Sequence, residues 1–140
     1  MNAPLYTTEI LRLAASLEAP RALEREDGRA EARSPTCGSI VSVAVQLDEH
    51  GRVATLSQTV HACAFGQASA ALLKRGAVGR SRSEVKDAHD RFALWLTGSG
   101  GEPDWPGFKA LTPARSRKSR HGAILLPFRA LLAAIDASNG

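Results

Sequence analysis

Two cysteines and one histidine are the residues of this 140-residue chain whose types and positions could support chemistry. Cys37 lies in the turn-like segment 35–39, and Cys63 lies where a β-branched run gives way to a helical pattern. His121 stands just before the last apolar segment. Thiolate and imidazole groups bind zinc, iron and iron–sulfur clusters, so the three residues predict a metal site if the fold brings them together. Two buried, unreactive cysteines and a surface histidine are the alternative.

The number of cysteines limits the kind of site that the chain can build. Two are too few for a disulfide framework in a chain of this length. They are also too few for a zinc site made of cysteines alone, which takes four ligands. Other residues must therefore complete any metal site. His121 is the first candidate, and His61, two residues before Cys63, is a weaker one.

A β-hairpin is predicted between the two cysteines. Apolar residues alternate with small or polar ones from Ile40 to Leu47, which is typical of a half-buried strand. Residues 48–51 supply a turn that ends in glycine, and a second β-branched run extends over 53–60. Because a hairpin returns the chain to its starting end, Cys37 and Cys63 are expected at the same end of the sheet.

Helical periodicity predicts helices over residues 6–18, 63–76 and 81–95 and a last helix that begins near Ala123. An earlier start is disfavoured because the ring of Pro127 clashes with the carbonyl four residues before it. Residues 21–34 alternate charged and small side chains, which predicts a solvated, flexible connection. Trp95 is expected in the core and Trp105 as a loop anchor. The order of elements predicts an α+β fold, an antiparallel sheet with helices packed on one face.

Length and composition exclude several classes of protein. One hundred and forty residues fit a single domain over 1–140, with its core in 36–137. Hydrophobic residues make up 44% and charged residues 23%, which argues against a disordered or collagen-like chain. No run approaches the roughly 20 apolar residues of a membrane helix. No secretory signal is visible at the N-terminus, so a cytoplasmic protein is expected.

The net charge of +4 is concentrated in one short segment. Residues 1–70 carry six Lys and Arg against eight Asp and Glu, whereas residues 71–140 carry twelve against six. The excess equals one acid-free run, formed by Arg115, Arg117, Lys118 and Arg120. Nucleic-acid binding is disfavoured because no aromatic residue within the run could stack on a base. A run of this kind is more often a solvated face or a patch that docks a protein.

Several motifs follow one another in the order of a known family. Tyr6 opens a helix that ends near Pro20, and the Cys-Gly turn 36–39 and the hairpin come next. The helix entry 63–69 (Cys-Ala-Phe-Gly-Gln-Ala-Ser) and the stretch 120–125 (Arg-His-Gly-Ala-Ile-Leu) complete the series. In these motifs the chain resembles the iron–sulfur cluster scaffold family that includes IscU, SufU and the N-terminal domain of NifU. The resemblance covers nearly the whole chain and implies an α+β protein that assembles a [2Fe–2S] cluster or binds zinc.

The chain departs from this family at two ligand positions. The first family cysteine is normally followed by Gly-Asp, and here Ser39 takes the place of the aspartate. The third family cysteine would fall at Gly122, after His121. The Leu-Pro-Pro-Val-Lys segment that chaperones recognise in IscU is also missing, and residues 117–120 occupy its neighbourhood. The resemblance therefore implies Cys37 and Cys63 as ligands, with His121 as a third, because a serine hydroxyl is a poor ligand for iron or zinc.

The resemblance implies a scaffold rather than an enzyme, with a labile [2Fe–2S] cluster, iron or zinc as cargo. Such a scaffold would pass clusters or sulfur to acceptors and dock a cysteine desulfurase or a cluster acceptor. The main alternative is a ligand-depleted interaction or regulatory module of the same fold that no longer holds a cluster. A third possibility uses Cys63 as a nucleophile or sulfur acceptor, with His61 or His121 as its base. A homodimer that shares one cluster also stays open.

Overall fold

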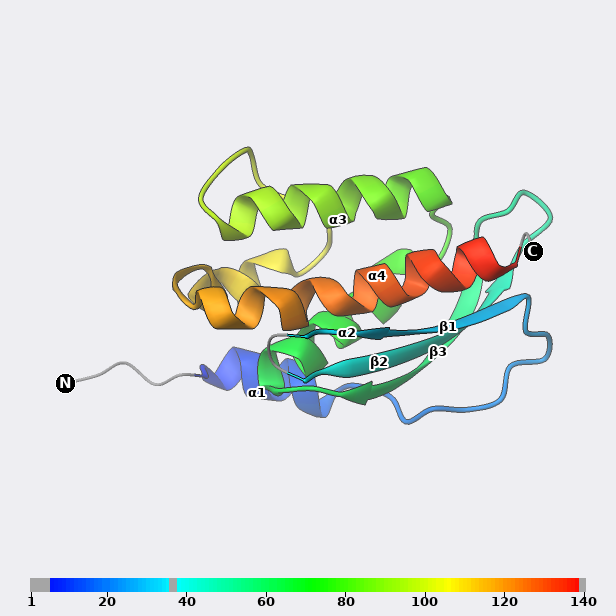
Figure 1. The fold of residues 1–140 in the computed structure, drawn as a ribbon, viewed down its shortest axis with the longest axis horizontal. Coiled ribbons are helices and arrows are strands. Elements are labelled where there is room, and N and C mark those ends of the chain that lie inside the picture. Colours follow the sequence, from blue (N-terminus) through cyan, green and yellow to red (C-terminus); the bar gives the residue numbers. More distant parts are fainter. Residues whose placement is uncertain (1–5, 36–37, 139–140) are drawn as a thin grey trace.

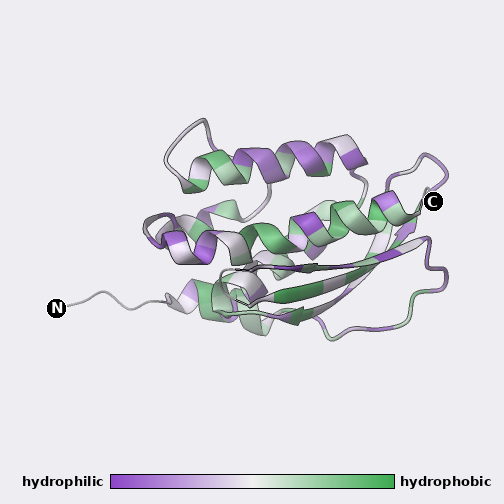
Figure 2. Cartoon of the chain, in the orientation of Figure 1, coloured by the Kyte–Doolittle hydropathy of each residue, from purple (hydrophilic) through white to green (hydrophobic). Residues whose placement is uncertain are grey.

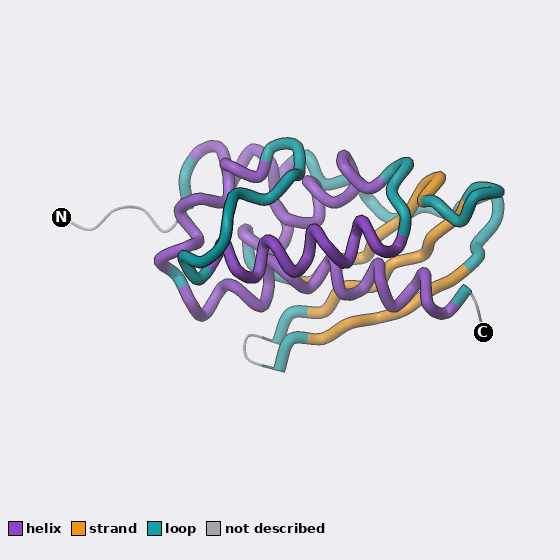
Figure 3. The backbone as a smooth tube through the Cα atoms, turned by 90° about the horizontal axis from the view of Figure 1, so that it is seen from above, coloured by secondary structure: helices purple, strands orange, loops and turns teal. Residues whose placement is uncertain are grey.

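A computed structural model describes residues 6–35 and 38–138 of the chain. The elements in chain order are α1 (Thr8–Ala15), β1 (Gly28–Arg33), β2 (Ile40–Leu47), β3 (Val53–His61), α2 (Ala64–Ala77), α3 (Arg82–Leu96), the 3₁₀ helices η1 (Phe108–Ser116) and η2 (Lys118–Arg120), and α4 (His121–Ala137). The strands form an antiparallel sheet in the order β1-β2-β3, and they run alongside one another (Figure 3). The predicted α+β fold is confirmed.

The helices form two tiers on the sheet. α4 packs on β1 and β2, and α2 packs on β3. α1 lies against α2, and α3 lies on the side of α4 away from the sheet (Figure 1). The outer position of α3 matches its hydrophilic surface, whereas β2 is strongly hydrophobic (Figure 2). Buried side chains from α1, the sheet, α2, α3, η1 and α4 form one hydrophobic core.

The local signals in the sequence explain several of these elements. Ser81 accepts a hydrogen bond from the backbone N–H of Glu84, whose carboxylate accepts one from the backbone N–H of Ser81, so the predicted capping box begins α3. Thr7 caps α1, which is shorter than the predicted 6–18. The hairpin is confirmed as β2 and β3, with a register irregularity between Gln46 and Leu47.

The prediction of a flexible connection over 21–34 is wrong for residues 28–33, which form β1. Every second residue of β1, namely Gly28, Ala30 and Ala32, pairs with a buried valine of β2. These residues are small because α4 packs directly on the strand. A Cβ at Gly28 would overlap the carbonyl oxygen of Ala134 in α4. Small inward residues between charged outward ones do not produce the apolar alternation by which strands are recognised.

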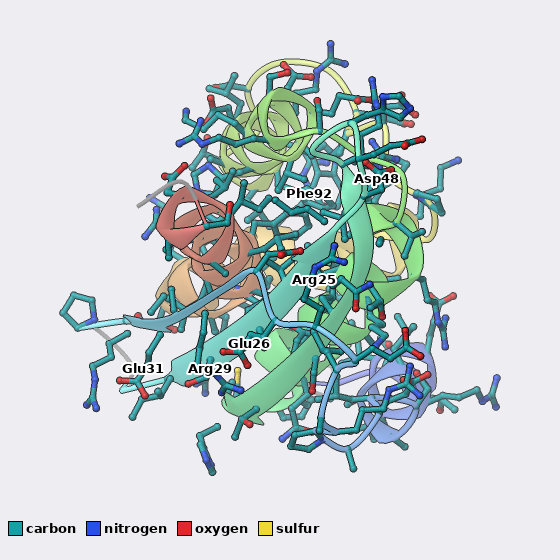
Figure 4. The ribbon with its side chains drawn as sticks, turned by 90° about the vertical axis from the view of Figure 1, so that its right-hand side faces the viewer. Arg25, Glu26, Arg29, Glu31, Asp48 and Phe92 are labelled. Atoms are coloured by element: carbon teal, nitrogen blue, oxygen red, sulfur yellow. The ribbon has the colours of Figure 1, made fainter. Side chains whose placement is uncertain are left out.

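The segment before β1 is held against the sheet by polar contacts. The backbone N–H of Arg21 donates to Ser57 Oγ at 2.9 Å, and the Arg25 guanidinium donates to the carbonyl of Leu47 at 2.7 Å. Arg25 also pairs with Asp27, and this hydrogen bond holds the pKa of the Asp27 carboxyl below its ordinary value. Glu26 and Arg29 form a second pair on the side of β1 away from α4 (Figure 4).

The two tryptophans lie where the sequence predicts them. Trp95 is buried, as expected, and Trp105 is also buried, with its Nε1–H donating to the carbonyl of Leu72 at 2.8 Å, as expected of a loop anchor. α4 begins at His121, two residues before the predicted start, and continues through Pro127. Within the described ranges, no helix has the length and apolar character needed to cross a membrane.

Candidate functional site

The candidate site lies at the end of the sheet where β1 turns into β2. The turn is closed by backbone hydrogen bonds from Ser34 N–H to the Ser39 carbonyl (2.9 Å) and from Gly38 N–H to the Ser34 carbonyl (3.0 Å). Ile40, which opens β2, pairs with His61, the last residue of β3. The turn and the approach to Cys63 therefore lie at the same end of the sheet, as the hairpin predicted. Cys37 itself lies outside the described residues.

Cys63 is the N-cap residue of α2 and is partly exposed. Its side chain makes no capping hydrogen bond, and the first turn of α2 contains no acidic residue. The unpaired N–H groups and the dipole at a helix N-terminus favour a negatively charged group. The position therefore suits a thiol that binds a cation or accepts a sulfur atom.

His121 is the first residue of α4 and is partly buried. Its Nε2 lies 2.9 Å from the carbonyl oxygen of Ala114 in η1. Because a carbonyl can only accept, this geometry places a proton on Nε2, so Nδ1 is the ring nitrogen left for a metal ion. Histidines that bind metals commonly donate their other ring N–H to a backbone carbonyl. The tautomer of His121 is therefore the one that leaves Nδ1 free to accept a cation.

The first turns of α2 and α4 pack against each other. A Cβ at Gly66 would lie 3.3 Å from the carbonyl oxygen of Ala123 and 3.4 Å from its Cβ, so the absence of a side chain permits a close approach of the two helices. Three residues further along α2, the buried Ser69 Oγ donates to the carbonyl of Ile124 at 2.6 Å. Cys63 and His121 therefore precede two helix turns that are in direct contact.

The position of the missing family cysteine faces the β1–β2 turn. A Cβ at Gly122 would lie 3.1 Å from the hydroxyl oxygen of Ser34, which is buried at the end of β1. This separation is a few tenths of an ångström short of an ordinary contact. Ser39, which replaces the family aspartate, is also buried. A side chain at residue 122 would point toward the turn that carries Cys37 in the sequence.

The described residues supply few donors for a metal or cluster at this end of the domain. Among them, no group of three His, Cys, Asp or Glu side chains is close enough to hold a metal ion. Cys63 and His121 supply one soft and one borderline donor at neighbouring helix starts, which suits iron or zinc. Two such donors fall short of the four ligands that a complete tetrahedral site takes.

The four cations of the basic run play different parts. Arg115 donates from Nε to the carbonyl of Trp95 at 2.9 Å, and its guanidinium lies 5.0 Å from the centre of the Trp95 ring. Arg117, Lys118 and Arg120 form no ion pair or side-chain hydrogen bond with another described residue. They lie on η2 and its flanking residue, immediately before His121. Arg115 thus helps to hold η1 against α3, whereas the side chains of the other three take no part in this contact.

The remaining histidines lie away from this arrangement. His61 is exposed at the end of β3, and His50 is exposed in the hairpin turn. The side chain of His89 in α3 is only 14% exposed. Its ring contacts Asp90 and accepts a hydrogen bond from Arg129 of α4. His89 therefore links α3 to α4.

Sequence patterns did not indicate the role of Ala114, whose carbonyl fixes the His121 ring. A backbone carbonyl carries no residue-type signal, and η1 was not predicted. The whole stretch between Trp105 and His121 lacks a clear helical period because two 3₁₀ helices occupy it. The contact could be found only from the folded chain.

Comparison with known proteins identifies the family. The sequence matches no protein-family model and no curated protein. Among solved structures, a nitrogen-fixing NifU-like protein (N-terminal) from Brucella abortus is 31% identical, with a TM-score of 0.86 over 96% of this chain and 94% of that one. With this identity over nearly the full length, the chain belongs to the NifU-like N-terminal family of iron–sulfur scaffold proteins.

A second solved structure supports the fold alone. It is a candidate iron–sulfur cluster assembly scaffold protein for the SUF system from the thermophile Fervidobacterium islandicum AW-1. It is 18% identical, covers 94% of this chain and 96% of its own, and has a TM-score of 0.80. At this identity the likeness shows that the two proteins share an arrangement of strands and helices. It does not transfer the roles of individual residues.

Proposed function

We propose that this protein is a non-enzymatic carrier in iron–sulfur cluster assembly. In this proposal Cys37, Cys63 and His121 hold iron, zinc or a [2Fe–2S] cluster as exchangeable cargo, which passes to acceptor proteins. Family membership supports the general role. The single observation that supports the site is the His121 ring, whose Nε2–H donates to the Ala114 carbonyl, as the second ring N–H of metal-binding histidines commonly does. A cytoplasmic location and a single domain over 1–140 stay predictions.

The proposed donor set explains why the cargo would be exchangeable. Two thiolates and one imidazole leave one position of a tetrahedral metal without a protein ligand. A cluster needs four ligands in all, so one chain falls short by at least one. Water, a small thiol or a partner residue would complete the shell. Each of these leaves more readily than a fixed side chain, which suits a carrier that must release its load.

Metal content tests this proposal. Protein purified without oxygen is expected to hold less than one equivalent of iron or zinc, and Cys37→Ser or Cys63→Ser should abolish it. His121→Ala should weaken zinc binding by roughly 10-fold or more because it removes one ligand. The matched control is His50→Ala in the exposed hairpin turn, which should bind as the wild type does. Stoichiometric metal in both cysteine variants would contradict the proposal.

A second candidate is an interaction or regulatory module that keeps the fold without cargo. One observation favours it: Gly122 stands where the family has its third cysteine. Anaerobic reconstitution with iron and sulfide separates the two candidates. Visible absorbance followed by transfer to an apo-acceptor indicates a carrier. Absence of both cluster and metal indicates the module.

We also propose that Arg117, Lys118 and Arg120 dock the acidic surface of a cysteine desulfurase or cluster acceptor. The support is the exposure of Arg117 and Lys118, with the half-buried Arg120 beside them at the start of α4, and the lack of ion pairs from these three to other described residues. Uncompensated cations raise the rate of encounter with an oppositely charged surface. Arg115 is left out of this set because it is bound to Trp95.

Charge reversal is the measurement for this docking patch. The double variant Arg117→Glu/Lys118→Glu is expected to weaken binding to a partner desulfurase by about tenfold, mainly through slower association. Surface plasmon resonance at two salt concentrations measures the rate, and salt should reduce the difference between variant and wild type. Arg21→Glu/Arg91→Glu carries the same charge change at exposed positions elsewhere and serves as the control. An equal loss of affinity in both variants would show that net charge alone causes the effect, and would contradict a local docking patch.

A further inference from the structure

A surface groove lies between α1, α2 and the start of η1, away from the cysteines. Its volume is about 290 Å³. Leu13 of α1, Leu72 of α2 and Ala110 of η1 form its apolar floor. The approach of η1 to this floor is close, because a Cβ at Gly107 would lie 2.7 Å from Leu72 Cδ2. The groove is thus bounded by three elements that are fixed to one another.

The size of the groove indicates its occupant. Sites for drug-sized ligands and cofactors occupy about 300–1,000 Å³, so this groove lies at the lower limit. An apolar depression beside two packed helices suits a single large side chain. Interfaces in which an amphipathic helix docks in a groove use such anchors, repeated at helical spacing. The dimensions therefore favour one aliphatic anchor of a partner helix over a cofactor.

The rim of the groove indicates the charge of that partner. Arg12 and Arg75 lie on the rim with one acid, Glu9. The Arg75 guanidinium donates to Ser16 Oγ at 2.9 Å, which holds it beside the groove. Neither arginine forms an ion pair with another residue in the described part of the chain. Two uncompensated guanidinium groups beside an apolar floor complement an apolar side chain flanked by carboxylates.

We propose that this groove docks an acidic amphipathic helix of a partner protein. A leucine-type side chain of the partner rests on Leu13 and Leu72, and carboxylates one turn away pair with Arg12 and Arg75. Leu72 and Arg75 follow Cys63 by nine and twelve residues in the same helix, which places them about 14–18 Å along α2. A partner held here leaves the thiol end of the domain uncovered. The groove is a separate surface from the cation patch on η2, and its function does not depend on metal binding.

A peptide pair tests the proposal with the full chain. The probe is an acetylated, amidated 14-residue helical peptide with leucines on one face and glutamates flanking them, and its partner has lysine in place of each glutamate. Methyl NMR is expected to show saturable shifts at Leu13 and Leu72 with the acidic peptide alone. Arg12→Glu/Arg75→Glu should weaken binding at least tenfold, whereas Arg21→Glu/Arg91→Glu should leave it within twofold. Arg12→Gln/Arg75→Gln removes both charges but keeps long polar side chains, so it is less prone to misfold than the charge reversal. This variant should also weaken binding.

The outcomes separate a docking groove from general electrostatics. Equal binding of the acidic and basic peptides overturns the proposal, as does binding that shifts methyl groups elsewhere than Leu13 and Leu72. Absence of saturable binding at millimolar acidic peptide also overturns it. If Arg12→Glu/Arg75→Glu and the control Arg21→Glu/Arg91→Glu lose the same affinity, the attraction comes from net charge, and the groove is not the docking site. All of these binding measurements are made with a metal chelator present. They therefore do not depend on whether the protein carries metal or a cluster.

Discussion

Replacing Gly122 by cysteine is expected to convert partial metal occupancy into stoichiometric binding, with zinc held at least about tenfold more tightly. The new thiol would lie in the first turn of α4, next to His121, and its Cβ would face the turn that joins β1 to β2. A third thiolate supplies the soft, charged donor that the family has at this position and that a hydroxyl cannot replace. Ser34 Oγ must give way by a few tenths of an ångström, because the new Cβ would start 3.1 Å from it.

Zinc titration with a chromophoric competitor measures this effect. Gly101→Cys is the matched control: Gly101 lies in a loop, its φ is not positive, and no atom lies within 4 Å of its added Cβ. This variant has the same number of thiols as Gly122→Cys but places the third one away from the site. A similar gain in both variants would show that any added thiol recruits metal. No gain from Gly122→Cys would contradict the assignment of the site to this end of the domain.

Replacing Gly28 by alanine is expected to destabilise the fold by about 3 kcal/mol, which is at the upper end for overpacking. The added Cβ would overlap the carbonyl oxygen of Ala134 and come within 3.0 Å of the backbone nitrogen of Ser138. Both atoms belong to the backbone at the C-terminal end of α4, so no side-chain rotation relieves the overlap. α4 must move away from β1, and the packing between them is lost along their common length.

Urea unfolding followed by far-UV circular dichroism measures this loss. Gly101→Ala provides the matched control, since its new Cβ meets no atom within 4 Å, and it is expected to change the free energy of unfolding by less than about 0.5 kcal/mol. Because α4 also carries His121, Gly28→Ala is expected to weaken metal binding together with stability. A variant as stable as wild type would show that α4 does not rest on β1 as closely as the structure has it.

Local signals accounted for most of the elements. Alternation and a glycine turn marked β2 and β3, and Ser81 with Glu84 marked the start of α3, because these patterns depend on residues within a few positions of one another. β1 was not predicted, and the reason is physical. Its inward residues are small because the backbone of α4 lies directly against the strand and leaves no room for larger side chains. A strand that buries so little apolar surface of its own has no hydrophobic pattern.

The candidate site was predictable in outline only. Cys63 at a helix start and the turn beside the end of β3 follow from the hairpin and from the change of period at that residue. The sequence also placed His121 near the start of the last helix. It could not indicate which nitrogen of the ring carries the proton, because the partner is a carbonyl seven residues away in an unpredicted 3₁₀ helix. Nor could it indicate that Arg115 is occupied by Trp95, twenty residues earlier.

The sequence alone determined the class of this protein, its hairpin, its main helices and the position of Cys63 at the start of a helix. These depend on periodicity, on caps and on motif order, all of which are local. The tertiary structure alone decided that residues 28–33 form the third strand, that the His121 Nε2 bonds to the Ala114 carbonyl, and that Arg115 is bound to Trp95. Each of these depends on which distant backbone groups approach one another, and only the packing of the helices on the sheet sets that.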